Sequence, residues 1–255
     1  MMYYYLLLLT LVSVSTCFPF QPGPMPPFNF TQRAKRNAIN GLWPDSTVPY
    51  KLGAGVLNDN GLKSNVEQAI NNINSATCVQ LVPQSSENDY VVIDTGSVDS
   101  CEADIGKVGG VQDIVLGSNP ACRETGMIIH LILHALGRGH EDVRPDRSDY
   151  IIVHYGNIPV NLHRNYDMRP NSNTDPLNIP YDYDSIMHQG NPAGSLWLQT
   201  LNTAYQNSIG QRQSLSVKDV DTVNGMYNNC AAPPPTTTTA ATTTTTNAKK
   251  EKGRG

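Results

Sequence analysis

The sequence predicts one continuous domain that mixes α-helices and β-strands, from about Asn37 to Cys230, with a flank of different composition on each side. Three observations lead to this prediction: apolar residues at helical spacing, short β-branched runs between turn residues, and one strongly apolar helix that carries two histidines. The chain has 255 residues, which is enough to bury a sizeable core.

The N-terminal flank begins with residues 1–17, which have the pattern of a secretory signal peptide. An apolar stretch from Tyr3 to about Val14 is followed by small residues. Because this stretch is only about 12 residues long, it is too short to span a bilayer stably, although an N-terminal anchor is the alternative. Cleavage after Ser15 or after Cys17 would decide whether Cys17 is retained. The sequence therefore favours a secreted, extracellular protein with no membrane span after signal removal.

Residues 18–36 are proline-rich and end in the basic cluster Arg33-Ala34-Lys35-Arg36, which is typical of sites cut by convertases of the secretory pathway. We interpret this segment as a short propeptide; a solvated charge cluster without a processing role is the alternative. Residues 231–255 consist of proline and threonine runs followed by charged residues. Such a composition cannot bury enough apolar surface to fold, so it predicts a disordered tail.

Within the domain, the elements follow from local patterns. Residues 61–76 carry apolar side chains at helical spacing and predict an amphipathic helix. Residues 90–93 and 111–116 are β-branched runs bounded by Gly, Asp and Asn, which is typical of strands. Ser216 and Asp219 form a capping-box-like start to a further helix that runs to about Tyr227.

The domain carries a net negative charge. Residues 37–230 hold 11 Lys and Arg against 21 Asp and Glu, whereas seven of the 18 basic residues lie in the two flanks. An acidic domain without a basic stripe argues against nucleic acid or an anionic membrane as its partner.

Four cysteines lie downstream of the signal region. Their even number in an exported chain predicts two disulfides, for which the sequence alone allows three connectivities. Zinc binding by these thiols is the competing interpretation, but no pair has Cys-x-x-Cys spacing. The four residues are Cys78, Cys101, Cys122 and Cys230.

Residues 126–142 (GMIIHLILHALGRGHED) hold the most informative pattern in the chain. His130 and His134 are four residues apart on an apolar helix, so both imidazoles project from one face and can reach a common metal. Gly137 permits a positive-φ turn that ends the helix and lets His140 approach from a third direction. Three neutral imidazoles with an open fourth position form a catalytic type of zinc shell. For His154, His163 and His188 we expect solvated, hydrogen-bonded or structural roles instead.

This pattern resembles the astacin family of secreted zinc metalloendopeptidases, a branch of the metzincins. The family motif is His-Glu-x-x-His-x-x-Gly-x-x-His-Glu, followed by a methionine turn of the form Ser-x-Met-His-Tyr. The resemblance extends over the whole domain. Its further matching residues are Arg36-Asn37-Ala38, Trp43-Pro44, Val48-Pro49-Tyr50, Thr77-Cys78-Val79, Gly106, Gly109-Gly110, Gln112, His140-Glu141, Arg144-Pro145-Asp146-Arg147, Asp149-Tyr150, Tyr181-Asp182-Tyr183, Ser185-Ile186-Met187-His188, Ile209-Gly210-Gln211-Arg212, Leu215-Ser216 and Cys230.

The resemblance implies an α+β fold of the metzincin type. In this fold, a zinc-bearing cleft separates an N-terminal half of sheet and helices from a largely irregular C-terminal half. One Zn²⁺ per chain would be held by His130, His134 and His140, with Met187 as the apolar base beneath the metal. A peptide or extracellular protein would bind in the cleft, and no oligomeric state follows.

The resemblance also implies covalent and processing features. It pairs Cys78 with Cys230 and Cys101 with Cys122. It further implies that cleavage after Arg36 frees the amine of Asn37 to enter the interior and meet Glu141.

The departures from the family motif concern the residues that would carry out catalysis. Leu131 stands where the family has its general base, and a leucine side chain has no proton acceptor. Gln189 replaces the tyrosine of the methionine turn, and its amide cannot supply a phenolate. Arg138 replaces a phenylalanine and puts a charge where an apolar side chain normally packs. The propeptide also lacks the Phe-x-Gly-Asp stretch whose aspartate caps zinc in latent relatives.

Our preferred hypothesis is a secreted zinc- and peptide-binding domain that has lost efficient peptide hydrolysis, and no residue is confidently assigned as catalytic. The second hypothesis is an active zinc metalloendopeptidase with a substitute base, for which Glu124 and Glu141 are the closest carboxylates in the sequence. The third is a purely structural fold without zinc, because a leucine beside the metal removes a negative charge and adds apolar bulk.

Overall fold

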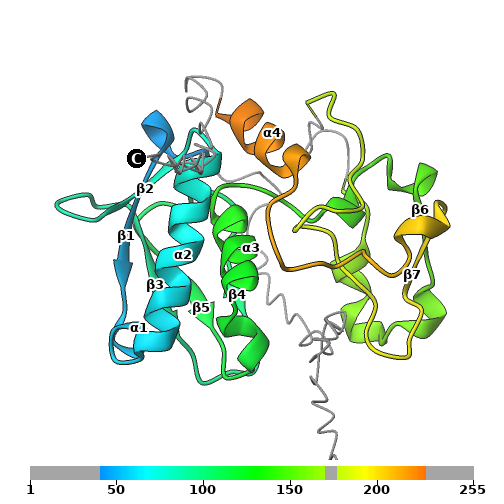
Figure 1. Cartoon of the computed structure of the whole chain (residues 1–255), viewed down its shortest axis with the longest axis horizontal. Helices are drawn as coiled ribbons and strands as arrows, with labels where there is room; N and C mark the ends of the chain where they lie inside the picture. The colour runs from blue at the N-terminus through cyan, green and yellow to red at the C-terminus, as the bar shows by residue number, and fades with distance from the viewer. Residues whose placement is uncertain (1–40, 170–176, 228–255) are drawn as a thin grey trace, which may run out of the picture.

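The computed structural model of the chain describes residues 41–169 and 177–227. Figure 1 shows a half on the left in which helices lie in front of a sheet, and a half on the right that consists largely of loops. The helices are α1 (Ala54–Leu57), α2 (Asn60–Ala76), α3 (Thr125–Ala135) and α4 (Val217–Met226), and the strands are β1 (Thr47–Leu52), β2 (Gln80–Pro83), β3 (Tyr90–Thr95), β4 (Glu102–Ala103), β5 (Val111–Leu116), β6 (Ile151–Val153) and β7 (Leu198–Thr200). This arrangement confirms the expected α+β class.

The N-terminal half is built on a five-stranded sheet in the order β2-β1-β3-β5-β4. The first four strands of this order pair in parallel, and β4 pairs antiparallel with β5 at the edge. Strands β3 and β5 are in register from Tyr90 opposite Val111 to Thr95 opposite Leu116, which confirms the two strands expected from the sequence.

Helix α2 forms where the apolar spacing predicts it. The side chain of Asp59 caps its first turn by accepting a hydrogen bond from the backbone N–H of Leu62. Its apolar stripe packs into the main core, and α2 lies side by side with α3 in front of the sheet (Figure 1). The buried residues of this stripe are Leu62, Val66, Ala69, Ile70 and Ile73.

Helix α3 is buried from Gly126 to Ala135, so it runs through the core instead of over its surface. The absence of a side chain at Gly126 allows the helix to approach the backbone of Arg212 closely. The helix ends before Gly137, whose φ of +104° confirms the expected turn. The chain then turns back toward the helix with His140.

The C-terminal half has little regular structure and a core of its own. Strands β6 and β7 form a small antiparallel pair, and short 3-10 turns connect most of the rest. The side chains of this second core are Ile151, Ile158, Leu162, Tyr166, Tyr181, Leu198 and Ile209. Helix α4 opens with the expected capping box, in which Ser216 and Asp219 each bond the backbone of the other.

The disulfide between Cys101 and Cys122 is present, as the family resemblance implied. The expected disulfide between Cys78 and Cys230 stays a prediction, because Cys230 lies outside the described residues. The signal region, the propeptide with Cys17, Asn37 and the C-terminal tail also lie outside them. Within residues 41–169 and 177–227, every helix is too short or too polar to cross a bilayer.

Candidate metal centre

Three imidazole rings converge at the end of α3. The Nε2 atom of His140 lies 3.2 Å from Nε2 of His134 and 3.3 Å from Nε2 of His130. The metal-binding nitrogens of all three residues lie within 4.8 Å of one another. Nitrogen ligands about 2.0–2.1 Å from a tetrahedral zinc ion are separated by roughly 3.3 Å, so the Nε2 spacing fits this metal.

The second nitrogen of two of the rings is fixed by backbone carbonyls. Nδ1 of His130 lies 2.8 Å from the carbonyl oxygen of Ile186, and Nδ1 of His134 lies 2.8 Å from that of Arg138. A carbonyl can only accept, so both rings carry their proton on Nδ1 and present the lone pair of Nε2 to the common centre. This is the tautomer that a metal ligand needs.

The protonation state of the three rings suits a metal in the same way. Burial lowers the pKa of His130 and of His140 well below the usual value, and it lowers the pKa of His134 to about 3. The charge of Arg212 lowers the pKa of His130 further, whereas the neighbouring His134 and then Arg212 lower the pKa of His140. The rings are therefore neutral at pH 7, and metal binding has no proton to displace from them.

The turn that carries Met187 is held against this centre by its backbone. The backbone N–H of Glu141 donates to the carbonyl oxygen of Met187 at 3.1 Å, and Ile186 supplies the carbonyl that orients His130. Met187 and Ile186 are fully buried in the main core. The role of Met187 as the apolar base of the metal stays a prediction.

Leu131, which the family resemblance places at the position of the general base, is 1% exposed and belongs to the main apolar core. Among the described residues, no carboxylate joins the cluster of three imidazoles. Glu124 is exposed at the start of α3, almost two turns before His130. The side chain of Glu141 accepts hydrogen bonds from two arginines and a backbone N–H.

Gln189, which the family resemblance places at the position of the tyrosine, is buried and bonded within the protein. Its amide Nε2 donates to Oδ2 of Asp142 at 2.9 Å and to the carbonyl oxygen of Asn165 at 3.1 Å. Its backbone N–H donates to Oδ1 of the same aspartate at 2.9 Å. Asp142 is not predicted as a site residue from the sequence, because its full burial, which requires hydrogen-bonding partners, is visible only in the fold.

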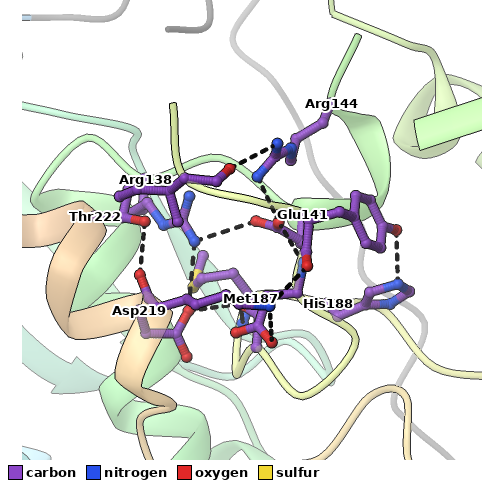
Figure 2. A network of polar contacts seen from close by, with 12 residues as sticks. Arg138, Glu141, Arg144, Met187, His188, Asp219 and Thr222 are labelled. Atoms are coloured by element: carbon purple, nitrogen blue, oxygen red, sulfur yellow. Dashed lines mark hydrogen bonds and ion pairs between the residues drawn. The ribbon is translucent and has the colours of Figure 1, made fainter. Parts of the chain in front are cut away.

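Glu141 lies within a buried network of charges, which Figure 2 shows from close by. Its Oε1 accepts from Arg144 at 2.8 Å and from the backbone N–H of Asp182 at 3.1 Å, and its Oε2 accepts from Arg138 at 3.2 Å. Arg138, expected to intrude into an apolar site, thus has an anionic partner, and it also reaches Asp219. The expected contact between Asn37 and Glu141 stays a prediction, because Asn37 lies outside the described residues.

The remaining histidines in the described part of the chain make hydrogen bonds to groups other than the three converging rings, in line with the roles expected for them. His188 bonds the hydroxyl of Tyr181 at 2.8 Å, and His154 bonds the side chain of Gln199 at 2.9 Å. His163 lies 2.9 Å from the carbonyl oxygen of Ile158.

Comparisons with known proteins agree with this site. Residues 35–228 match the family model described as Astacin, a peptidase family. The chain is 37% identical over 207 residues to Astacin-like metalloprotease toxin 2 of Loxosceles intermedia. The aligned region covers 77% of this chain and 78% of that protein. It is 35% identical over 189 residues to Zinc metalloproteinase nas-14 of Caenorhabditis elegans. This aligned region covers 73% of this chain but only 37% of the longer relative.

Among solved structures, the chain resembles High choriolytic enzyme 1, a hatching enzyme zinc-protease from Oryzias latipes. The two share 29% sequence identity at a TM-score of 0.66, over 75% of this chain and 94% of the other.

Proposed function

The chain belongs to the astacin family of zinc metallopeptidases, and from this premise we propose that it is a secreted member that binds zinc and a peptide or extracellular protein but hydrolyses peptide bonds poorly. The observation that carries the proposal is the fully buried, apolar Leu131 beside an intact set of three imidazole ligands. The zinc site itself is that of the family: His130, His134 and His140 would hold the ion.

The expected defect lies in proton transfer. A bound zinc ion supplies Lewis acidity toward a carbonyl oxygen and a water molecule. The protein must still take a proton from the attacking water and return it to the leaving amine. Leu131 can do neither, because its side chain has no lone pair. General acid–base assistance contributes about 10²–10⁴ in rate, and here one residue would serve both transfers, so the loss lies near the upper end.

The carboxylates nearest in sequence are poor substitutes for the missing base. Both carboxylate oxygens of Glu141 are already paired with arginines, and those of Asp142 accept from Gln189. Moving the carboxylate of Glu141 or of Asp142 away from these buried partners would cost several kcal/mol. Glu124 is exposed at the N-cap of α3, far from the end of the helix where the imidazoles converge. These contacts count against the hypothesis of an active enzyme with a substitute base.

Stabilisation of the transition state is also expected to be weak. Both N–H groups of the Gln189 amide face acceptors within the protein, Asp142 and the Asn165 carbonyl. Rotating the amide toward a substrate would leave the buried Asp142 with fewer donors, at a cost of about 1–3 kcal/mol.

Secretion and processing belong to the same proposal. The signal-like opening 1–17 and the basic cluster before Asn37 support export and removal of a short propeptide. The disulfide between Cys101 and Cys122 supports an oxidising compartment.

The decisive experiment compares the natural chain with Leu131→Glu. Both are expressed by secretion, loaded with zinc, analysed for the state of the Arg36 junction, and assayed on an unfolded protein substrate. We expect Leu131→Glu to raise kcat/KM by at least about 100-fold, since it restores a proton acceptor beside the metal. Turnover of the natural chain equal to that of the variant would overturn the proposal.

Two controls make the result specific. Adding His134→Ala to the Leu131→Glu chain removes one ligand, so the gained hydrolysis should disappear; activity that persists would come from a contaminating protease. Metal analysis of the natural chain, purified without chelators, should give one zinc per chain. A chain purified without zinc would favour the purely structural hypothesis.

A further inference from the structure

The guanidinium of Arg138 bridges two buried carboxylates that belong to different parts of the chain. Its Nη2 atom lies 3.2 Å from Oε2 of Glu141 and 3.4 Å from Oδ1 of Asp219 in α4 (Figure 2). We propose that Arg138 is a positioning residue of the metal centre: it aligns the three imidazoles by tying together the segments that orient them.

The contacts of Arg138 lead to each of the three ligands by a short path. Its own carbonyl oxygen accepts from Nδ1 of His134 at 2.8 Å. Its partner Glu141 directly follows His140 in the chain, and the backbone N–H of that glutamate donates to Met187. A shift of the Arg138 side chain therefore moves the loop that carries His140 relative to the helix that carries His134.

The third path runs through Asp219. Its Oδ2 accepts from the backbone N–H of Ile186 at 2.8 Å, and its Oδ1 accepts from the hydroxyl of Ser185 at 2.6 Å. The carbonyl oxygen of Ile186 in turn orients His130. Through Asp219, Arg138 is therefore linked to the turn that fixes the orientation of the His130 ring.

Electrostatics explain why a cation suits this position. Glu141 is 1% exposed and Asp219 is fully buried, while the Arg138 side chain is 12% exposed. Glu141 forms a second ion pair with Arg144. Asp219, among the described residues, forms an ion pair with Arg138 alone. Because buried carboxylates need compensation, a neutral residue at 138 would remove the ion pair of Asp219 and leave it with hydroxyl and backbone donors and the electrostatic effect of Arg212.

The test measures zinc affinity and the geometry of the site in the full chain. In Arg138→Gln, we expect the zinc dissociation constant, obtained by competition with a chelator, to rise by about tenfold. This is the lower end of the loss typical of a direct partner of a metal ligand, because the guanidinium acts on the ligands through Glu141 and Asp219. The absorption spectrum of the cobalt-loaded variant should also change. Arg123→Gln is the matched control, because Arg123 lies at the turn before α3 and its Nε contacts the carbonyl of Gly117; it should leave both readouts unchanged.

Two further variants separate positioning from a general loss of stability. Arg138→Lys keeps the cation on a shorter side chain, so its zinc affinity should lie between those of the natural chain and of Arg138→Gln. In the double variant Arg138→Gln with Asp219→Asn, the unpaired buried charge is gone. The melting temperature of its metal-free form should therefore recover relative to Arg138→Gln, while zinc affinity stays low because the bridge is still missing.

The proposal is wrong if Arg138→Gln lowers the melting temperature but keeps its zinc affinity within threefold of the natural value. It is also wrong if the double variant regains both together. If Arg138→Gln does not fold, the same comparison is made with Arg138→Lys, for which zinc affinity and cobalt spectrum identical to the natural chain would overturn the proposal.

Discussion

At the scale of single residues, the metal centre is defined by which nitrogen of each ring holds the proton. The carbonyls of Ile186 and Arg138 fix that proton on Nδ1 of His130 and His134. Both carbonyls lie in segments outside α3, one in the methionine turn and one in the loop after the helix. The helix therefore supplies these two ligands, whereas other segments supply their orientation.

The depressed pKa values of the ligands predict how the metal-free chain responds to acid. An unfolded histidine binds a proton near pH 6.5, whereas burial lowers the pKa of His134 and keeps it neutral down to about pH 3 in the folded chain. Between these values the unfolded state binds more protons, so the free energy of unfolding falls as the pH falls. The slope is at most about 1.4 kcal/mol per pH unit for each such histidine.

Urea unfolding in the presence of a chelator at pH 7.0, 6.0 and 5.0 measures this slope. The variant His134→Gln, which has no titratable group at this position, should show a shallower dependence on pH. Equal stability of the natural metal-free chain at all three pH values would contradict the expected protonation behaviour.

At the scale of elements, α3 depends on the close approach of its first turn to another segment. A Cβ atom at Gly126 would lie 1.7 Å from the backbone carbonyl oxygen of Arg212. Backbone atoms at such a distance cannot rotate away as a flexible side chain can, so either the helix or the segment around Arg212 would have to move.

We therefore expect Gly126→Ala to destabilise the fold by about 1–3 kcal/mol, even though alanine is the better helix former. Thermal unfolding measures the effect. Gly156→Ala is the matched control, since a Cβ atom at Gly156 would meet nothing within 4 Å and its φ is not positive. Equal melting temperatures of the two variants would show that the contact with Arg212 is not restrictive.

Several strands could not be predicted from local sequence patterns. Strand β1 lies inside the sheet between β2 and β3, yet it contains Pro49, which lacks a backbone donor and argues against an inner strand. The very short β4, β6 and β7 carry too few residues to show a period. Helix α2 and strand β5, by contrast, have the length and pattern needed for a prediction from the sequence.

At the scale of the whole molecule, the metal centre links segments that are distant in the chain. His130 and His134 belong to α3, which runs through the main core, whereas His140 follows on a loop that is held to the methionine turn through Glu141 and Met187. A bound ion would therefore stabilise the contact between these segments as well as the fold.

Removal of zinc with a chelator should accordingly lower the melting temperature; at free zinc 1,000 times the dissociation constant, linkage contributes about 4 kcal/mol. Hydrogen exchange should rise most at residues 138–142 and 185–189, and least in β3 and β5. His130→Ala, without chelator, should give the same pattern. A uniform rise across the chain would show that the metal stabilises the fold without specifically joining these segments.

The sequence by itself determined the helices with a clear apolar period, the three histidine ligands, and the absence of a carboxylate at position 131. These features depend on spacing within one turn or on residue identity, which are local and therefore visible in the chain. Tertiary structure alone decided the partners of the charged and polar groups. Gln189 meets Asp142 across 47 positions, and Arg138 meets Asp219 across 81. Such pairs form because buried charges and amides must be satisfied once the chain has folded, and the sequence does not state which of many candidates will be near.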